Sequence, residues 1–144
     1  MKYRKGVFFV VYRKKKDKIE YLVLKRKLHW KGWEFPKAGV KTWERVKKKQ
    51  AVIRELKEEA GGCKPIKIKD MKTRGKYKYD HKMADRPWIG QTYALFAVEV
   101  KCSGKVKIDK HEHSSYKWLE FSKATKILTW ANQKKCLRLV NKKK

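Results

Sequence analysis

Short runs of β-branched and aromatic residues alternate with charged turns along most of the chain, a pattern that predicts a strand-rich protein. Residues 6–12 and 19–26 flank a polar turn, so we expect them to form a hairpin. A turn is also expected at Ser103 and Gly104. The remaining expected strands are 34–36, 65–71, 75–82, 89–100, 105–108 and 116–120.

Helical spacing occurs first between residues 51 and 60, where Val52, Leu56 and Ala60 fall on one face of a helix of about four turns. Two more helices are expected near the C-terminus. One covers 122–128, and the other begins at 129 or 131 and ends near 140.

Residues 1–144 are short enough for one domain around one core, and the basic tail 141–144 is expected to fray. Strands before and after a central helix, followed by C-terminal helices, predict an α/β fold. We expect a mixed β-sheet sandwiched between helices.

The central helix concentrates carboxylates beside its apolar face. The chain has 14 acidic residues against 42 basic ones, yet four glutamates fall in one short segment. These are Glu44, Glu55, Glu58 and Glu59. Stacked like charges cost stability, and a hard divalent cation such as Mg²⁺ relieves that cost. A solvated acidic face neutralised by Lys48 and Lys57 is the competing interpretation.

Residues 54–61, Arg-Glu-Leu-Lys-Glu-Glu-Ala-Gly, resemble the second half of the Nudix box residue by residue. Upstream of them, Lys37, Ala38 and Gly39 form an expected loop of small residues that lets the backbone approach an anion. The first half of the box departs from the family pattern. Ala38 stands in place of a glycine, and nine residues instead of seven separate Glu44 from Arg54.

A second segment, residues 111–135, resembles the closing segment of asymmetric diadenosine tetraphosphate hydrolases, a Nudix subfamily. It contains His-Glu-His and Tyr-x-Trp-Leu. The resemblance implies the Nudix fold and a pyrophosphohydrolase that uses Mg²⁺, or Mn²⁺ as a substitute, to convert diadenosine tetraphosphate to ATP and AMP.

The same resemblance assigns roles to individual residues. The implied metal ligands are Glu55, Glu58, Glu59 and Glu112. Arg54 orients the glutamates, Glu112 serves as an extra ligand or as the base, and Glu44 and Gly61 are structural positions of the motif.

For substrate binding we expect Lys37, Ala38 and Gly39 near the phosphates. The candidates for base stacking are Tyr77, Tyr79 and Tyr116, with Trp30 behind them. Core packing competes with stacking for each of these aromatic residues. Trp118 is expected in the core, and Glu99 on the surface or as a minor ligand.

His111 and His113 lie two residues apart, which raises the alternative of a zinc pair on one face of a strand. The spacing of the chain suggests no third nitrogen or sulfur ligand to complete such a site. Solvated loop histidines are the competing interpretation.

The net charge of +28 favours a polyanionic partner, and nonspecific RNA binding at low salt is expected. General enrichment of surface lysine explains the same charge without a partner. Two other functions therefore stay open: an RNA 5′-end pyrophosphohydrolase, and a catalytically weak Nudix scaffold that binds RNA or nucleotide. The altered spacing after Glu44 favours the scaffold.

Three widely spaced cysteines, Cys63, Cys102 and Cys136, predict reduced thiols in a cytoplasmic protein. The apolar run near the N-terminus is too short to cross a membrane, so no membrane partner is expected.

Overall fold

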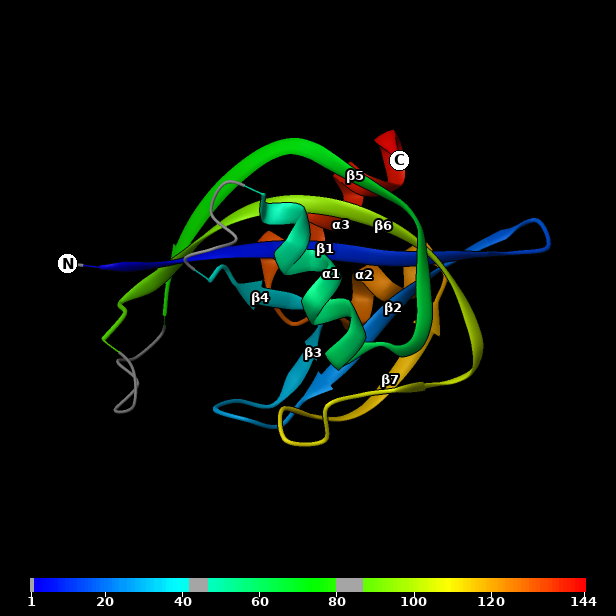
Figure 1. Ribbon diagram of the computed structural model, residues 1–144, viewed down its shortest axis with the longest axis horizontal. Coiled ribbons are helices and arrows are strands. Elements are labelled where there is room, and N and C mark those ends of the chain that lie inside the picture. The colour runs from blue at the N-terminus through cyan, green and yellow to red at the C-terminus, as the bar shows by residue number, and fades with distance from the viewer. Residues whose placement is uncertain (1, 42–46, 80–86) are drawn as a thin grey trace.

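The computed structural model describes residues 2–41, 47–79 and 87–144. These residues form one seven-stranded sheet and three helices (Figure 1). The strands are β1 (Tyr3–Lys15), β2 (Lys18–Arg26), β3 (Gly32–Glu34), β4 (Lys37–Gly39), β5 (Gly61–Lys78), β6 (Gly90–Lys107) and β7 (His113–Leu119). The helices are α1 (Lys48–Glu59), α2 (Phe121–Ile127) and α3 (Ala131–Lys143).

The sheet is mixed, as predicted. Its main order is β3-β2-β1-β6-β5, with β4 paired to β1 and β7 paired to β2. β1 and β2 form the expected antiparallel hairpin, and β1 runs parallel to β6 from the pair Tyr3 and Gly90 to the pair Tyr12 and Glu99. The central strand β1 therefore joins the two halves of the sheet.

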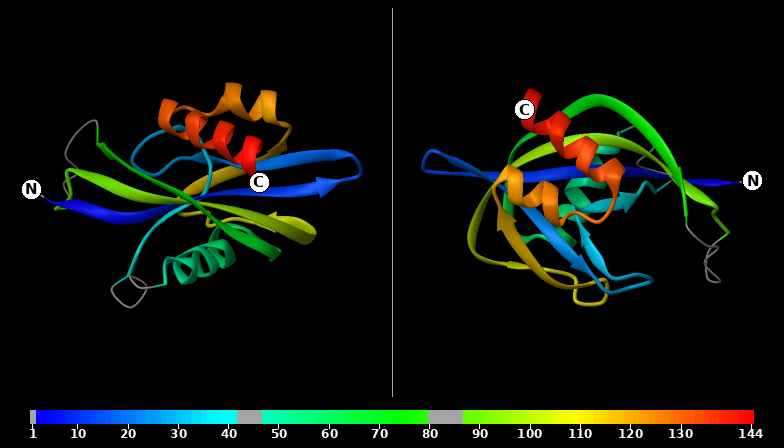
Figure 2. Two further views of the ribbon diagram at one scale, coloured as in Figure 1. Left: turned by 90° about the horizontal axis from the view of Figure 1, so that it is seen from above. Right: turned by 180° about the vertical axis from the view of Figure 1, so that it is seen from behind.

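Helices cover both faces of the sheet, which confirms the predicted α/β arrangement. In Figure 2, α1 lies on one side of the strands and α2 and α3 lie on the other. Alternate residues of β1 serve the two faces: Val7 and Phe9 pack in the core cluster beneath α1, whereas Phe8 and Val10 pack in the cluster beneath α2 and α3. Helix α1 therefore rests on a layer of buried side chains from the sheet.

The structure corrects several expected boundaries. Residues 37–39 form strand β4 instead of a loop, because their backbone pairs with Gly6–Phe8 of β1. The strands expected at 65–71 and 75–82 merge into β5 as far as Lys78, with register shifts that accommodate the intervening residues. The turn expected at Ser103 and Gly104 lies inside β6, where Gly104 has a positive φ of 79°.

Residues 141–143 of the C-terminal tail continue α3. Tyr21 Oη donates a hydrogen bond of 2.7 Å to Asn141 Oδ1, and Val140 is fully buried. These contacts hold the last turn of α3 against the sheet.

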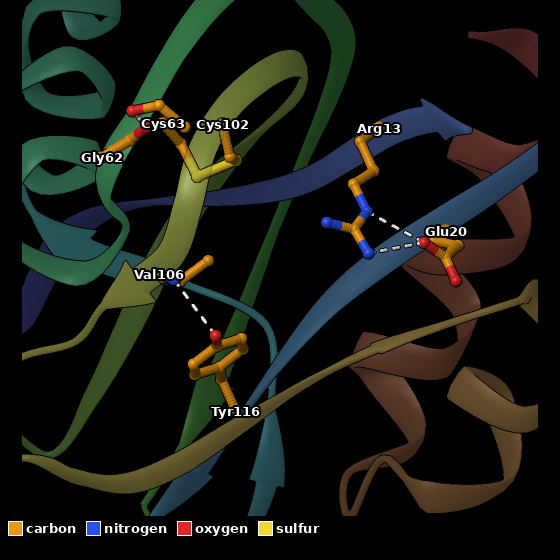
Figure 3. Close-up of a disulfide and its surroundings, with 8 residues drawn as sticks. Arg13, Glu20, Gly62, Cys63, Cys102, Val106 and Tyr116 are labelled. Carbon is orange, nitrogen blue, oxygen red and sulfur yellow. Dashed lines mark hydrogen bonds and ion pairs between the residues drawn. A yellow bond between two sulfur atoms is a disulfide. The ribbon is translucent and has the colours of Figure 1, made fainter.

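A disulfide joins Cys63 of β5 to Cys102 of β6, so the prediction of reduced thiols was wrong for this pair (Figure 3). The two residues are far apart in sequence but face each other in the antiparallel register of β5 and β6. Cys136 is free and buried, as expected for a structural thiol. None of the helices in the described ranges is long and apolar enough to cross a membrane.

Reduction of this disulfide is expected to lower the free energy of unfolding by about 3 to 4 kcal/mol, because the bond closes a loop with a sequence separation of 39. Urea unfolding with and without a reductant measures the change. The variant Cys63→Ala/Cys102→Ala is the control, and its midpoint should not respond to reductant. An unchanged wild-type midpoint would contradict the prediction.

Candidate functional site

A cleft of about 900 Å³ brings together residues from α1, β1, β4, β5 and the start of α3. Most of the residues predicted from the sequence line it. From that set the cleft contains Arg54, Glu55, Glu58, Glu112, Lys37, Ala38, Gly39, Tyr77 and Tyr79, and also Trp30. The structure therefore places the expected acidic, basic and aromatic groups around one volume.

The acidic wall comes from two elements. Helix α1 contributes Glu55 and Glu58, and Glu112 comes from the turn before β7. The carbonyl of Glu112 accepts hydrogen bonds from the backbone N–H groups of Lys27 and Leu28, which fixes this turn beside the end of β2. Residues far apart in the chain are thereby held at one site.

Burial, and then repulsion from Glu58, Glu59 and Glu112, raises the pKa of Glu55 to about 8. Arg54 opposes this rise. Four carboxylates therefore lie close enough together that three of them raise the pKa of the fourth. Such a cluster favours a bound cation.

Arg54 connects α1 to β4. Its Nη2 donates a 2.9 Å hydrogen bond to the carbonyl of Gly39, and its Nη1 donates to Glu55 Oε2 at 3.0 Å. The guanidinium therefore fixes the helix to the strand and orients one carboxylate of the acidic wall.

Glu59 lies beneath the cleft and not on its wall, with 1% of its surface exposed. Its Oε2 is 2.6 Å from Nδ1 of His113, whose Nε2 is 2.8 Å from Oε2 of Glu34. Burial alone would lower the pKa of His113, but the two carboxylates raise it to about 9. His113 is thus an imidazolium that holds Glu59 in place.

Glu34 is the centre of this buried network, and it was not among the residues predicted from the sequence. Its carboxylate also pairs with Arg26 at 3.2 Å and with Lys37 at 3.3 Å. Burial would raise the pKa of Glu34, but Lys37, His113 and Arg26 together lower it to about 2. An isolated glutamate in a short strand gives no sequence signal of this kind.

The donor atoms present fit a divalent metal. Glu59 and Glu112 each offer a carboxylate oxygen, and these atoms lie within 4.8 Å of each other and of a ring nitrogen of His113. Glu59 Oε1 is buried without a hydrogen-bond partner among the described residues, which is the environment that a cation satisfies.

The zinc pair does not form. Both ring nitrogens of His113 face carboxylates, whereas His111 is exposed in the turn before β7. The oxygen-rich set of glutamates suits Mg²⁺ or Mn²⁺ better than Zn²⁺.

Aromatic side chains line another part of the cleft. Trp30 and Trp130 meet edge to face with their ring centroids 5.2 Å apart, and Tyr77 contacts Tyr79 in the same manner at 6.0 Å. Trp130 and Trp88, which also line the cleft, were not predicted from the sequence. Lys37 Nζ lies 5.8 Å from the Trp30 ring and 5.9 Å from the Tyr77 ring. The ammonium group of Lys37 thus faces both the Glu34 carboxylate and these two aromatic rings.

Tyr116 is not brought to the cleft. It packs against the core cluster beneath α1, and its hydroxyl accepts a 3.1 Å hydrogen bond from the backbone N–H of Val106 (Figure 3). Trp118 is also partly buried against that cluster, as expected. Glu99 is partly buried, pairs with Lys14 at 3.9 Å and does not line the cleft.

The two structural positions of the motif have different outcomes. Glu44 lies outside the described residues. Gly61 begins β5 directly after α1, where a side chain at this position would press on Lys107. The next residue, Gly62, has a φ of 91°, a conformation that favours glycine.

Comparison with protein families gives a match to the NUDIX domain over residues 2–140. Among curated proteins, the RNA pyrophosphohydrolase of a Nitratiruptor species is 32% identical over 108 residues, which cover 72% of this chain and 68% of the relative.

Solved structures agree with this match. A C. elegans Ap4A hydrolase in a binary complex is 26% identical, with a TM-score of 0.73 and 96% of each chain covered. The E. coli dihydroneopterin triphosphate pyrophosphohydrolase has a TM-score of 0.74 at 18% identity, covering 98% of this chain and 99% of that one. At 18% identity, the similarity to the E. coli enzyme shows a shared fold only.

Proposed function

Because this chain belongs to the Nudix hydrolase family, we propose that its pyrophosphohydrolase chemistry acts on a dinucleoside polyphosphate, with diadenosine tetraphosphate giving ATP and AMP. The observation that carries this proposal is the meeting of an acidic wall and an aromatic wall in one cleft of about 900 Å³. The 26% identity to an Ap4A hydrolase along 96% of both chains supports the same substrate class.

In this proposal Glu55, Glu58, Glu59 and Glu112 would hold Mg²⁺, which when bound would neutralise phosphate charge and lower the pKa of a water so that it can be deprotonated for attack on phosphorus. His113 and Arg54 are positioning residues, since they act on Glu59 and Glu55. Glu112 lines the cleft from the turn before β7 and is either a further ligand or the group that accepts the proton of the attacking water.

The remaining cleft residues serve binding. The rings of Trp30, Tyr77 and Tyr79 offer faces for an adenine base, and each stacked base contributes about 1 to 3 kcal/mol. Lys37 and the backbone of Ala38 and Gly39 lie nearby for the phosphate chain. The pairing of Lys37 with Glu34 fixes the position of its ammonium group.

Cleavage of a substrate panel tests the proposal. The panel contains diadenosine tetraphosphate, nucleoside triphosphates, NADH and a 5′-triphosphorylated RNA, each with Mg²⁺ and with EDTA. We expect ATP and AMP from diadenosine tetraphosphate, with the rate lost in EDTA. No cleavage of any phosphoanhydride in Mg²⁺ or Mn²⁺ would contradict the proposal and favour a scaffold that only binds nucleotide or RNA.

A second candidate function is the removal of pyrophosphate from RNA 5′ ends. The observation that favours it is the 32% identity to an RNA pyrophosphohydrolase over 72% of this chain. Ionic strength separates the two candidates, because the binding of a transcript weakens steeply with salt and that of a dinucleotide weakens less.

A further inference from the structure

Beside the cleft lies a second concavity of about 500 Å³, which we name the basic groove. Its cations are Lys5, Lys48, Arg74 and Lys76, and Thr92 adds a hydroxyl group. No acidic residue of the described ranges lines it. The groove is formed by β1, β5, β6 and the start of α1, and its cations come from β1, β5 and α1.

The basic groove continues from the cleft. Lys5 and Val40 line both, and Lys76 Nζ lies 5.3 Å from the ring of Tyr3, which is a residue of the cleft wall. A ligand whose terminal phosphates occupy the cleft can therefore extend past Lys5 and Val40 into the basic groove.

The charges of the basic groove are largely uncompensated. Lys5 and Lys48 form no ion pair with the described residues, and Arg74 has only an exposed pair with Asp70 at 3.4 Å. Lys48 also stands in the first turn of α1, where no acidic residue is present and a cation opposes the helix dipole. Lys5 and Lys48 can therefore bind an anion without displacing an acidic partner among the described residues.

From this geometry we infer that the basic groove binds the phosphodiester backbone of a single-stranded RNA whose 5′-triphosphate occupies the cleft. Such an RNA has a terminal polyphosphate, which suits the cleft, and a regularly charged chain, which suits the basic groove. Lysine, arginine and threonine bind such a backbone without reading the bases, so the groove confers a preference for chain length and not for sequence. The inference rests on the second candidate of the proposed function and adds the surface on which the rest of the transcript binds.

The test variant is Lys48→Gln/Lys76→Gln, because neither residue lines the cleft and both side chains belong to the groove. The matched control is Lys64→Gln/Lys67→Gln, which removes the same charge from exposed positions of β5 outside the groove. Binding of a 5′-triphosphorylated RNA of about ten nucleotides is measured by fluorescence anisotropy in EDTA at several salt concentrations. Cleavage of the same RNA and of diadenosine tetraphosphate is measured in Mg²⁺.

We expect the groove variant to bind the RNA about tenfold more weakly, with the slope of log K against log salt reduced by about 1.4 for two lost phosphate contacts. Its KM for the RNA should rise by a similar factor, while its kcat/KM for diadenosine tetraphosphate stays within about twofold of wild type. The control variant should retain wild-type RNA binding.

Equal losses in the groove and control variants would overturn the inference, because they would show that only diffuse charge matters. Unchanged RNA binding in the groove variant would overturn it as well. The anisotropy measurement needs no turnover, so an inactive wild-type enzyme would count against the proposed function and leave the binding result to decide the groove.

Discussion

Replacement of Glu58 by glutamine is expected to lower kcat for diadenosine tetraphosphate by about 100- to 1,000-fold. Glu58 lies on the cleft wall beside Glu55, and the glutamine keeps its size while removing one of the negative charges proposed to hold Mg²⁺. Because Glu58 is exposed, and its loss reduces repulsion within the acidic wall, the variant should fold as well as wild type. Steady-state kinetics and thermal unfolding measure the two effects.

Glu120→Gln is the matched control, since Glu120 is also exposed but lies outside the cleft and pairs only with Lys18 at 3.4 Å among the described residues. Its kcat should equal that of wild type. Full activity of Glu58→Gln in Mg²⁺ would remove Glu58 from the proposed metal ligands. Loss of activity together with unchanged nucleotide binding would separate an enzyme from a binding scaffold.

Replacement of Glu34 by alanine is expected to lower the free energy of unfolding by about 3 to 5 kcal/mol. The change leaves Arg26 and His113 charged and buried without their common carboxylate partner. Urea denaturation measures the loss. Glu20→Ala is the control, because it breaks a comparable pair with Arg13 at 2.8 Å in a more exposed position (Figure 3). Its free energy of unfolding should fall by only about 0.2 to 1 kcal/mol. Similar losses in both variants would contradict a special role for burial.

The pH dependence of Glu34→Gln provides a second check. The pKa of Glu34 falls from 4.5 to about 2 on folding, so its charge stabilises the fold above pH 4.5 and loses this effect as the pH falls toward 2. The difference in unfolding free energy between wild type and Glu34→Gln should therefore be constant near neutral pH and narrow in acid. A difference that does not change with pH would show that the charge of Glu34 is not the source of stability.

The acidic wall is the part of the site that the sequence predicts best. Glu55 and Glu58 are placed by helical periodicity alone, and the apolar residues of α1 determine which face of the helix is buried. Glu112 was predicted only from the family resemblance. No local sequence pattern indicates that the turn containing Glu112 lies near the helix that carries Glu55. The structure supplies that connection through the anchoring of the turn to the end of β2.

Glu34 was not predicted, and His113 was considered only as half of a zinc pair, for a different reason. Each is an ordinary polar residue in its own segment, and each becomes important only because β3 and β7 flank β2 in the sheet. The same applies to the disulfide, since Cys63 and Cys102 meet through the register of two long strands. Which strands pair in the sheet, and in which register, cannot be predicted from the hydrophobic periodicity of each segment.

The parallel pairing of β1 with β6 also has a kinetic consequence. Tyr3 pairs with Gly90, so the pairing of β1 with β6 forms only after most of the chain is available, whereas β1 can pair with β2 earlier. Contacts of such long sequence separation slow folding, because the entropy of closing a large loop is lost before the contacts form. A chain emerging from the ribosome would carry α1 and its glutamates well before the turn that supplies Glu112, so the complete carboxylate cluster forms only late in synthesis.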